Sequence, residues 1–303
     1  MSCAIITCGG IGDVCQALSA ATLFEAEHNR KADIYVNSHI EILDFIKKCT
    51  YFNVFQCPSR TNEYKDPENP LNLPKTFLDN LINEYDAVYS CWPDSLTLAW
   101  HAFPWKDYVR TYKAFMQTKV SLKANENFKH EAIKPNTKNI FIHVTSITME
   151  KNYPLPKLQA LVNLFNKVGY NIIIARTSQW KGSPLPFFCQ GNYIDLVDRP
   201  LEETINILNK CDYFIGIDSA YAHISFHLQI PRIVLQQRYQ TPYHIIRYHE
   251  TCEDDMPLES PLESIFNRVM LNLTEPLTSA IPAYVQIPYQ ADMRNLLIKK
   301  DFT

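Results

Sequence analysis

Residues 211–235, CDYFIGIDSAYAHISFHLQIPRIVL, constrain the fold more than any other stretch of the chain. Tyr213–Ile217 is a short apolar run of the kind that forms a buried parallel strand, and the Asp-Ser pair after it favours a turn and a helix cap. Residues 220–228 have apolar side chains at helical spacing, and residues 232–235 are apolar again. This order predicts strand, sharp turn, helix and strand, which is one right-handed βαβ unit.

The helix of this unit has a chemical consequence at its first turn. The first backbone N–H groups of a helix have no intrahelical acceptor, and the helix dipole places partial positive charge there. In a βαβ unit this turn lies at the carboxyl edge of the sheet. The sequence therefore predicts an anion site at this edge, most usefully one for a phosphate group.

Strand and helix patterns alternate through both halves of the chain, which is typical of doubly wound parallel sheets. A polar, charged stretch at residues 122–139 separates the halves. We expect an α/β fold class with two Rossmann-like domains facing a cleft: residues 1–130, residues 131–275, and a segment at 276–303 that crosses back to the first domain. The expected strands are 2–7, 32–36, 54–55, 87–90, 140–144, 171–175, 193–196, 213–217 and 232–235, and the expected helices are 14–28, 40–48, 75–84, 155–168, 201–209, 220–228 and 291–300.

Composition narrows the functional classes. The chain has 303 residues, 46% of them apolar, and a formal net charge of −3 without a long basic run. This charge does not indicate a nucleic-acid partner, although a local basic groove would be compatible with it. Nine cysteines without metal-ligand spacing predict reduced thiols. We see no signal peptide and no apolar run long enough to span a membrane, so we expect a cytoplasmic protein.

Three of only seven glycines, Gly9, Gly10 and Gly12, lie close together after the first strand. Such a concentration favours a backbone that turns tightly or approaches a ligand closely. Their spacing is not the G-x-G-x-x-G fingerprint of dinucleotide-binding folds, and no acidic residue ends the next strand, where Val36 and Asn37 stand. The pattern therefore argues against a dinucleotide-dependent dehydrogenase.

Three motifs in order resemble the heptosyltransferase-like glycosyltransferases, family nine of the GT-B fold. That family has Gly-Asp at the start of its first helix, a strand ending in His-X-Thr-Thr/Ser with a lysine a few residues on, and Asp-Thr/Ser-Gly followed by His. The sequence has an alanine where the family has glycine, and residues 176–185 do not match the family stretch that supports the nucleoside. The matching residues here are Gly12-Asp13; His143-Val144-Thr145-Ser146 with Lys151 and Tyr153-Pro154; and Asp218-Ser219-Ala220 with His223.

The resemblance implies a metal-independent, inverting glycosyltransferase that moves a sugar from a nucleotide-diphosphate sugar to an acceptor hydroxyl. No cofactor is implied, because the nucleotide sugar is a co-substrate, and no Asp-X-Asp metal motif is present. Asp13 would be the catalytic base that accepts the proton of the acceptor hydroxyl. The residues expected to bind the donor or its phosphates are Thr145, Ser146, Lys151, Arg176, Asp218, Ser219, Ala220 and His223.

Each of these residues also has a purely structural interpretation. Asp13, and the Asp218-Ser219 pair, would serve as ordinary helix caps, and His223 would pack under the sheet. Lys151 would be a solvated surface lysine. A helix N-terminus also lowers the pKa of an aspartate and makes it a weaker base, which weighs against Asp13.

Other functions on the same fold stay open at this stage. One is a GT-B enzyme that glycosylates a modified base in nucleic acid, for which Lys106, Arg110, Lys113 and Lys119 would provide a basic groove. A second is a nucleotide-sugar epimerase. A third is a catalytically inactive scaffold that binds a nucleotide sugar.

Overall fold

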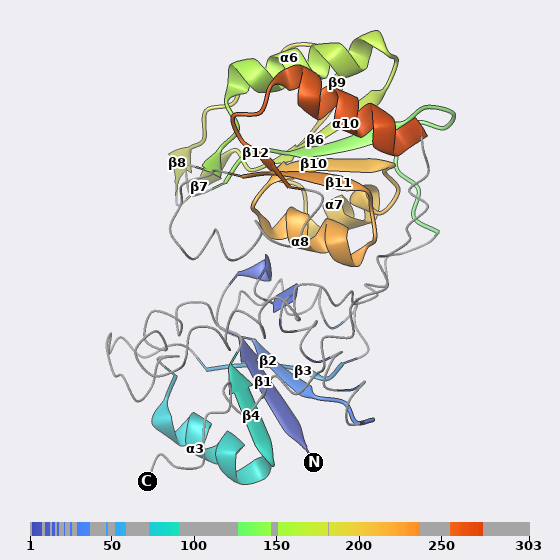
Figure 1. The fold of residues 1–303 in the computed structure, drawn as a ribbon. Coiled ribbons are helices and arrows are strands. Elements are labelled where there is room, and N and C mark those ends of the chain that lie inside the picture. The colour runs from blue at the N-terminus through green and yellow to red at the C-terminus, as the bar shows by residue number, and fades with distance from the viewer. Residues whose placement is uncertain are drawn as a thin grey trace. The chain divides into compact units, whose positions relative to one another are not determined.

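The computed structural model describes residues 2–7, 10–12, 14–15, 17, 21, 25, 29–36, 47, 52–58, 73–90, 127–146, 151–180, 182–236 and 255–274. The chain folds into two compact units, residues 1–123 with 284–303 and residues 124–283. Each described unit is α/β with a parallel sheet (Figure 1). Two doubly wound, Rossmann-like units were the fold class predicted from the alternating pattern, and this prediction is confirmed.

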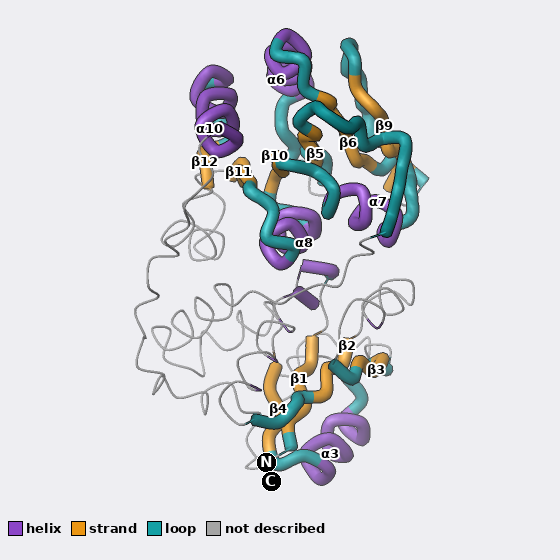
Figure 2. The backbone as a smooth tube through the Cα atoms, turned by 90° about the vertical axis from the view of Figure 1, so that its right-hand side faces the viewer, coloured by secondary structure: helices purple, strands orange, loops and turns teal. Residues whose placement is uncertain are grey.

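The sheet of the second unit has the strand order β12-β11-β10-β5-β6-β9 (Figure 2). Along the chain, the strands run outward from β5 to β6 and β9, and then outward on the other side from β10 to β11 and β12. This is the doubly wound order in which ligands bind at the switch point, between the first and the fourth strand. The strands are β5 Asn139–His143, β6 Asn171–Arg176, β9 Tyr193–Val197, β10 Tyr213–Ile217, β11 Arg232–Gln236 and β12 Asp255–Pro257.

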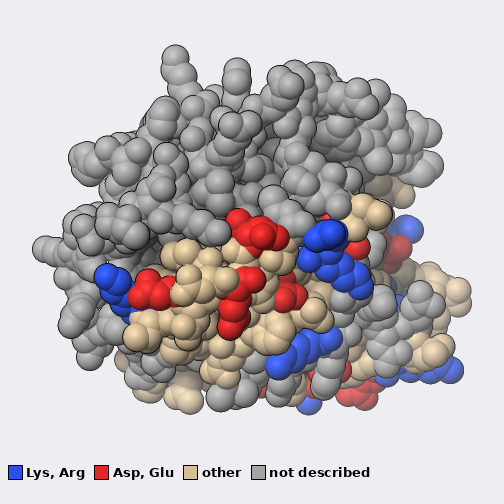
Figure 3. All heavy atoms as spheres, turned by 90° about the horizontal axis from the view of Figure 1, so that it is seen from below, with Lys and Arg blue, Asp and Glu red and all other residues tan. Residues whose placement is uncertain are grey.

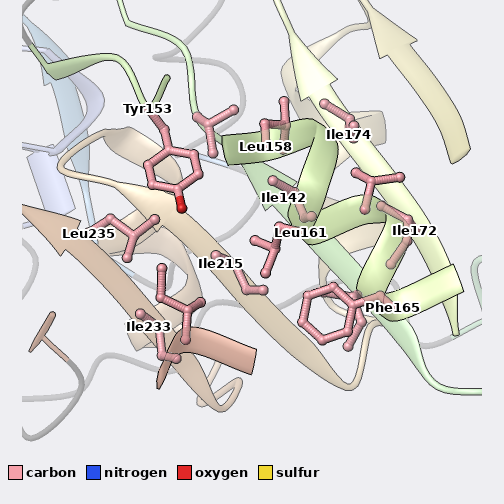
Figure 4. Close-up of a cluster of buried hydrophobic side chains, with 14 of the residues drawn as sticks. Ile142, Tyr153, Leu158, Leu161, Phe165, Ile172, Ile174, Ile215, Ile233 and Leu235 are labelled. Atoms are coloured by element: carbon pink, nitrogen blue, oxygen red, sulfur yellow. The ribbon is translucent and has the colours of Figure 1, made fainter. Parts of the chain in front are cut away.

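Helices cover both faces of this sheet. α6 Leu155–Lys167 and α10 Leu262–Thr274 lie on one face, and α7 Leu201–Leu208 and α8 Ala220–His227 lie on the other (Figure 1). Because side chains alternate across a strand, every second residue of β5, β6, β10 and β11 faces α6 and α10. Figure 4 shows these aliphatic side chains packed against Leu158, Leu161 and Phe165 of α6. Burial of this core holds the central strands and hence their carboxyl ends in place.

The first unit repeats the start of the same plan. Its sheet has the order β3-β2-β1-β4, so β1 and β4 meet where the winding direction reverses. The apolar face of α3 packs with Ala4, Ile6 and Val88 of the sheet. The elements are β1 Cys3–Thr7, β2 Asp33–Val36, β3 Val54–Gln56, α3 Lys75–Glu84 and β4 Ala87–Ser90.

Most predicted bounds agree with the structure to within one or two residues. α3, β4 and β10 agree at both ends. The helix expected to begin at residue 14 is already helical at Ile11, with Val14 N–H bonded to the Gly10 carbonyl oxygen at 3.2 Å. Apart from Lys47, the expected helices 40–48 and 291–300 lie outside the described residues.

The sequence reading missed four elements. β12 extends the second sheet, and α10 extends its helical cover. α10 could have been predicted, because Leu262, Ile265, Phe266 and Val269 have helical spacing. β7 Gln179–Trp180 and β8 Ser183–Pro184 form a small antiparallel hairpin after β6. A two-residue strand carries no periodic signal, so the hairpin could not be predicted from the pattern.

Candidate active site

The candidate phosphate site lies at the switch point of the second unit. β5 and β10 are neighbours in the sheet, with His143 paired in register with Gly216. The segments that follow these two strands therefore emerge side by side at the carboxyl edge. Two motifs that are about 70 residues apart in the sequence, the one after β5 and the one after β10, are brought together by this pairing.

Lys151 and Asp218 form an ion pair across the switch point. The Lys151 Nζ atom donates to Asp218 Oδ2 at 2.7 Å, and the two side chains are only 19% and 10% exposed. On the other side of the carboxylate, His223 Nε2 lies 3.9 Å from Asp218 Oδ1. The Asp218 carboxylate thus holds a lysine ammonium group at the edge where the anion is expected, and its own expected contact with the nucleotide sugar stays a prediction.

Ser219 lies at the N-cap position of α8, but its side chain makes no capping hydrogen bond. Its Oγ atom lies instead 3.1 Å from His143 Nδ1. Burial lowers the pKa of His143 to about 4, while a hydrogen bond from the imidazole to its own backbone carbonyl acts in the opposite direction. His143 is therefore neutral near pH 7. The helix-cap interpretation of Ser219 explains its position but not the direction of its hydroxyl group.

Tyr221 holds the other side of the His143 imidazole. The two rings are 4.5 Å apart between centroids, with an interplanar angle of 49°. The Tyr221 hydroxyl lies 2.7 Å from Thr204 Oγ1 on α7, and Thr204 Oγ1 donates to the Leu201 carbonyl oxygen at 2.9 Å. The Tyr221 hydroxyl is therefore the donor in its contact with Thr204. Burial raises the pKa of Tyr221, so the hydroxyl stays protonated.

The remaining residues expected after β5 and β10 lie at the same edge. Thr145 and Ser146 are half-buried in the turn after β5, and Ser146 N–H donates to the Asn152 side-chain oxygen. Ala220 is the first residue of α8, where the family motif has glycine. The structure thus brings Thr145, Ser146, Lys151, Asp218, Ser219, Ala220 and His223 to one edge of one sheet.

Arg176 is engaged elsewhere. It ends β6, and its guanidinium makes a two-pronged contact with Asp195 of β9, with Nη2 2.6 Å from Oδ2 and Nε 3.0 Å from Oδ1. The same group lies 4.5 Å from the centre of the Phe187 ring. These contacts give Arg176 a structural role between β6 and β9, and its expected contact with the donor stays a prediction.

In the first unit, the glycine-rich turn is only partly described. Gly9 and Asp13 lie outside the described residues. Gly10 precedes the helix that is present at Ile11, and Gly12 is within that helix. The φ angle of Gly10 is not in the left-handed region, and no described atom lies within 4 Å of the position that a Cβ would take. Among the described atoms, neither strain nor crowding requires glycine at this position, and the close approach of a ligand stays a prediction.

A basic surface, a metal site or a membrane-spanning helix among the described residues would each indicate a different function. Lys and Arg side chains are interspersed with Asp and Glu over the described part of the face in Figure 3. The four basic residues of the nucleic-acid alternative lie outside the described residues. In the described parts of the chain, no three His, Cys, Asp or Glu side chains are grouped to hold a metal ion. No described helix has the length and apolar character to cross a membrane.

Sequence reasoning missed the contact between His143 and Ser219 and the packing of Tyr221. The position of His143 at the end of a buried strand gives no indication of its partner in the sequence. The available signal was the strand alternation: residues 141 and 143 of β5 and 214 and 216 of β10 share a face. A histidine at the end of that face, opposite a glycine, has space to reach the turn after β10.

The chain matches a known family over nearly half of its length. Residues 97–240 match the model of glycosyltransferase family 9 (heptosyltransferase). That region includes the motifs that follow β5 and β10, and it does not include Gly12-Asp13. No curated protein sequence matches the chain.

Solved structures resemble the chain along most of its length. The ADP-heptose lipopolysaccharide heptosyltransferase II of E. coli is 12% identical with a TM-score of 0.60, covering 90% of this chain and 99% of that chain. The E. coli heptosyltransferase WaaC with ADP is 15% identical with a TM-score of 0.53, covering 90% and 98%. The spinosyn rhamnosyltransferase SpnG complexed with thymidine diphosphate is 12% identical with a TM-score of 0.51, covering 91% and 92%. At these identities the likeness shows the fold, which is GT-B.

The resemblance predicted from the three motifs is therefore confirmed. Residues 97–240 are similar to the heptosyltransferase family of glycosyltransferases, and the chain has the GT-B fold.

Proposed function

We propose that the chain is a metal-independent, inverting glycosyltransferase that moves a sugar from a nucleotide-diphosphate sugar to an acceptor hydroxyl. The observation that carries the proposal is the pairing of β5 with β10, which brings Lys151, Ser219 and the first turn of α8 to one edge of the sheet. A diphosphate is the ligand that such a set of donors and positive charge suits best.

The chemistry follows from the leaving group. When the bond between the sugar and the diphosphate breaks, negative charge develops on the departing phosphate oxygen. The Lys151 ammonium, the Ser219 hydroxyl and the first N–H groups of α8 would stabilise this charge. Asp218 holds Lys151 in position by its 2.7 Å contact, so little reorganisation is needed when the donor binds. These groups would take the place of a metal ion at the diphosphate.

The acceptor side of the reaction would depend on Asp13. A carboxylate after the first strand would take the proton of the acceptor hydroxyl as its oxygen attacks the anomeric carbon. One base and one in-line displacement invert the anomeric configuration. Because Asp13 lies outside the described residues, its role rests on the sequence motif.

The choice of nucleotide is guided by the relatives. The family model that matches is that of the heptosyltransferases, and one similar structure holds ADP whereas another holds thymidine diphosphate. We propose an ADP-linked sugar as the first donor to test, with a dTDP-linked sugar as the second. The acceptor would be a carbohydrate or another hydroxyl compound.

The test is a transfer assay with EDTA present. Purified protein is incubated with ADP-heptose, ADP-glucose or a dTDP-sugar and a panel of hydroxyl acceptors, and release of nucleoside diphosphate is measured. We expect release that depends on the acceptor, a product with inverted anomeric configuration by NMR, and no effect of EDTA. A retained configuration or activity that requires added metal would contradict the mechanism.

The Asp13→Asn variant tests the base. We expect transfer to fall by at least about 100-fold, since general base catalysis typically contributes this much, while the donor still binds in a calorimetric titration. Turnover equal to that of the unchanged protein would exclude Asp13 as the base. Donor binding without transfer or hydrolysis in the unchanged protein would instead support an inactive, nucleotide-sugar-binding scaffold.

A further inference from the structure

The hydroxyl of Ser219 is turned away from its helix. At an N-cap position, a serine Oγ ordinarily accepts a hydrogen bond from the second or third N–H group of the helix. In α8 the third of these groups, Ala222 N–H, bonds instead to the Ser219 backbone carbonyl at 3.0 Å, and Ser219 Oγ lies against His143. The Ser219 side chain thus does not occupy the N–H groups of Ala220 and Tyr221, and a contact outside the helix must fix the direction of its hydroxyl group.

The direction of the bond between His143 and Ser219 decides what the hydroxyl can do. A neutral imidazole carries one proton, so one ring nitrogen donates and the other accepts. Nδ1 is the ring nitrogen that lies 3.1 Å from Ser219 Oγ, and the tautomer sets which of the two atoms donates. A proton on Nδ1 makes Ser219 Oγ an acceptor. The hydrogen of the serine hydroxyl is then free to point at another group.

The His143 imidazole is held in place by Tyr221, which is in turn held by Thr204. Thr204 Oγ1 is fixed to the main chain of α7 and accepts from the Tyr221 hydroxyl, and the Tyr221 ring packs on His143. Thr204 is 1% exposed. The ring therefore has little freedom to turn away from Ser219.

We propose that His143 is a positioning residue for the diphosphate of the donor: it donates from Nδ1 to Ser219 Oγ, so that the Ser219 hydroxyl donates to a phosphate oxygen beside the first turn of α8. This inference rests on the proposed function, because it assigns a further residue to the same site. His143 itself does not touch the ligand, and its whole effect passes through Ser219.

Binding of inorganic pyrophosphate, measured by isothermal titration calorimetry, tests the proposal without requiring the right sugar. Ser219→Ala removes the hydroxyl, and His143→Phe keeps the size of the ring but removes its donor. Each change should weaken binding by about 10-fold, the usual effect of one hydrogen bond to a charged group. Because both remove the same interaction, the double variant should bind no more weakly than either single variant.

A conservative variant separates positioning from packing. The Nδ2 of an asparagine lies at the same distance from its Cα as the Nδ1 of histidine, so His143→Asn should bind pyrophosphate within about threefold of the unchanged protein. A merely structural role for His143 predicts the reverse order, with the bulkier phenylalanine tolerated better than asparagine. Losses that add in the double variant, or unchanged binding by His143→Phe, would overturn the proposal.

A measurement on the unchanged protein covers the case in which His143→Phe does not fold. Side-chain ¹⁵N chemical shifts at pH 7 distinguish the two neutral tautomers, and the His143 signal is identified by its loss in His143→Asn. A proton on Nδ1 is expected, and a proton on Nε2 overturns the proposal.

The outcome for His143 is separate from the outcome for the proposed function. If no nucleotide sugar is transferred but the pyrophosphate coupling between His143 and Ser219 holds, the enzyme proposal fails and the positioning role stands. If transfer occurs and the coupling is absent, only the positioning role fails. Failure of the unchanged protein to bind pyrophosphate would also overturn it.

Discussion

The ion pair between Lys151 and Asp218 can support the fold, and its ammonium group can bind the diphosphate. Removal of the Lys151 ammonium group separates these two roles. Lys151→Met keeps most of the length and the apolar stem of the side chain but removes the ammonium group that the Asp218 carboxylate, 10% exposed, contacts at 2.7 Å. If the pair only supports the fold, the variant should lose stability and nothing else. If Lys151 also binds the diphosphate, the variant should lose affinity for pyrophosphate as well.

The magnitude follows from the burial of the pair. Loss of one partner of a fully buried ion pair costs about 3–5 kcal/mol, whereas an exposed pair contributes about 0–1 kcal/mol. With side chains that are 19% and 10% exposed, the pair is close to the buried case but retains some solvent. We expect Lys151→Met to lower the free energy of unfolding by about 2–3 kcal/mol, or the melting temperature by about 4–12 °C.

A second change isolates the function. In Lys151→Met with Asp218→Asn, the charges of both partners are removed, so stability should return to within about 1 kcal/mol of the unchanged protein. Pyrophosphate binding should stay at least about 10-fold weaker in both variants, because neither has the ammonium group. Urea denaturation without ligand and calorimetric titration measure the two quantities. Recovery of binding together with stability would refute the role of Lys151 at the phosphate.

Three further perturbations test other parts of the structure. Gly216→Ala places a Cβ 2.3 Å from a carbon of the buried Phe214 ring and should lower the free energy of unfolding by about 1–3 kcal/mol or more. Gly10→Ala, with no described atom within 4 Å of the new Cβ, should lower it by under about 1 kcal/mol in the same urea titration. Burial lowers the pKa of His143 from 6.5 to about 4, so as the pH falls the unfolded chain binds a proton at this residue before the folded chain does. The free energy of unfolding should therefore fall by up to about 3 kcal/mol between pH 6.5 and 4. His143→Asn should lack this part of the pH dependence. Tyr153→Phe removes a buried hydroxyl without a partner among the described residues, from a ring that lies in the aliphatic cluster of Figure 4, and should leave stability unchanged or raise it by about 1 kcal/mol; a loss of that size would reveal a partner.

Much of the architecture could be read from local patterns. The apolar runs of β1, β5 and β10 and the helical spacing of α3 and α6 gave their positions, because a buried parallel strand and an amphipathic helix each leave a periodic signature in a few consecutive residues. The patterns did not reveal the hairpin of β7 and β8, which is too short for a period.

For the candidate site, the sequence supplied the residues but not their partners. Lys151 and Asp218 were both assigned to the phosphate from motifs, yet their pairing with each other depends on a distance between segments 67 residues apart. Arg176 was assigned to the donor because it follows a strand, whereas the neighbouring strand β9 supplies Asp195 to bind it.

The sequence by itself determined the fold class, the two-unit plan and the set of polar residues at the carboxyl ends of the strands, since each of these depends on the order of residues along a short segment. Only the tertiary structure decided that β5 and β10 are neighbours, and with that pairing the contacts of Lys151 with Asp218 and of His143 with Ser219. The physical reason is that strand order in a parallel sheet is set by how helices pack on its two faces, which is a property of the whole domain and leaves no local trace in the chain.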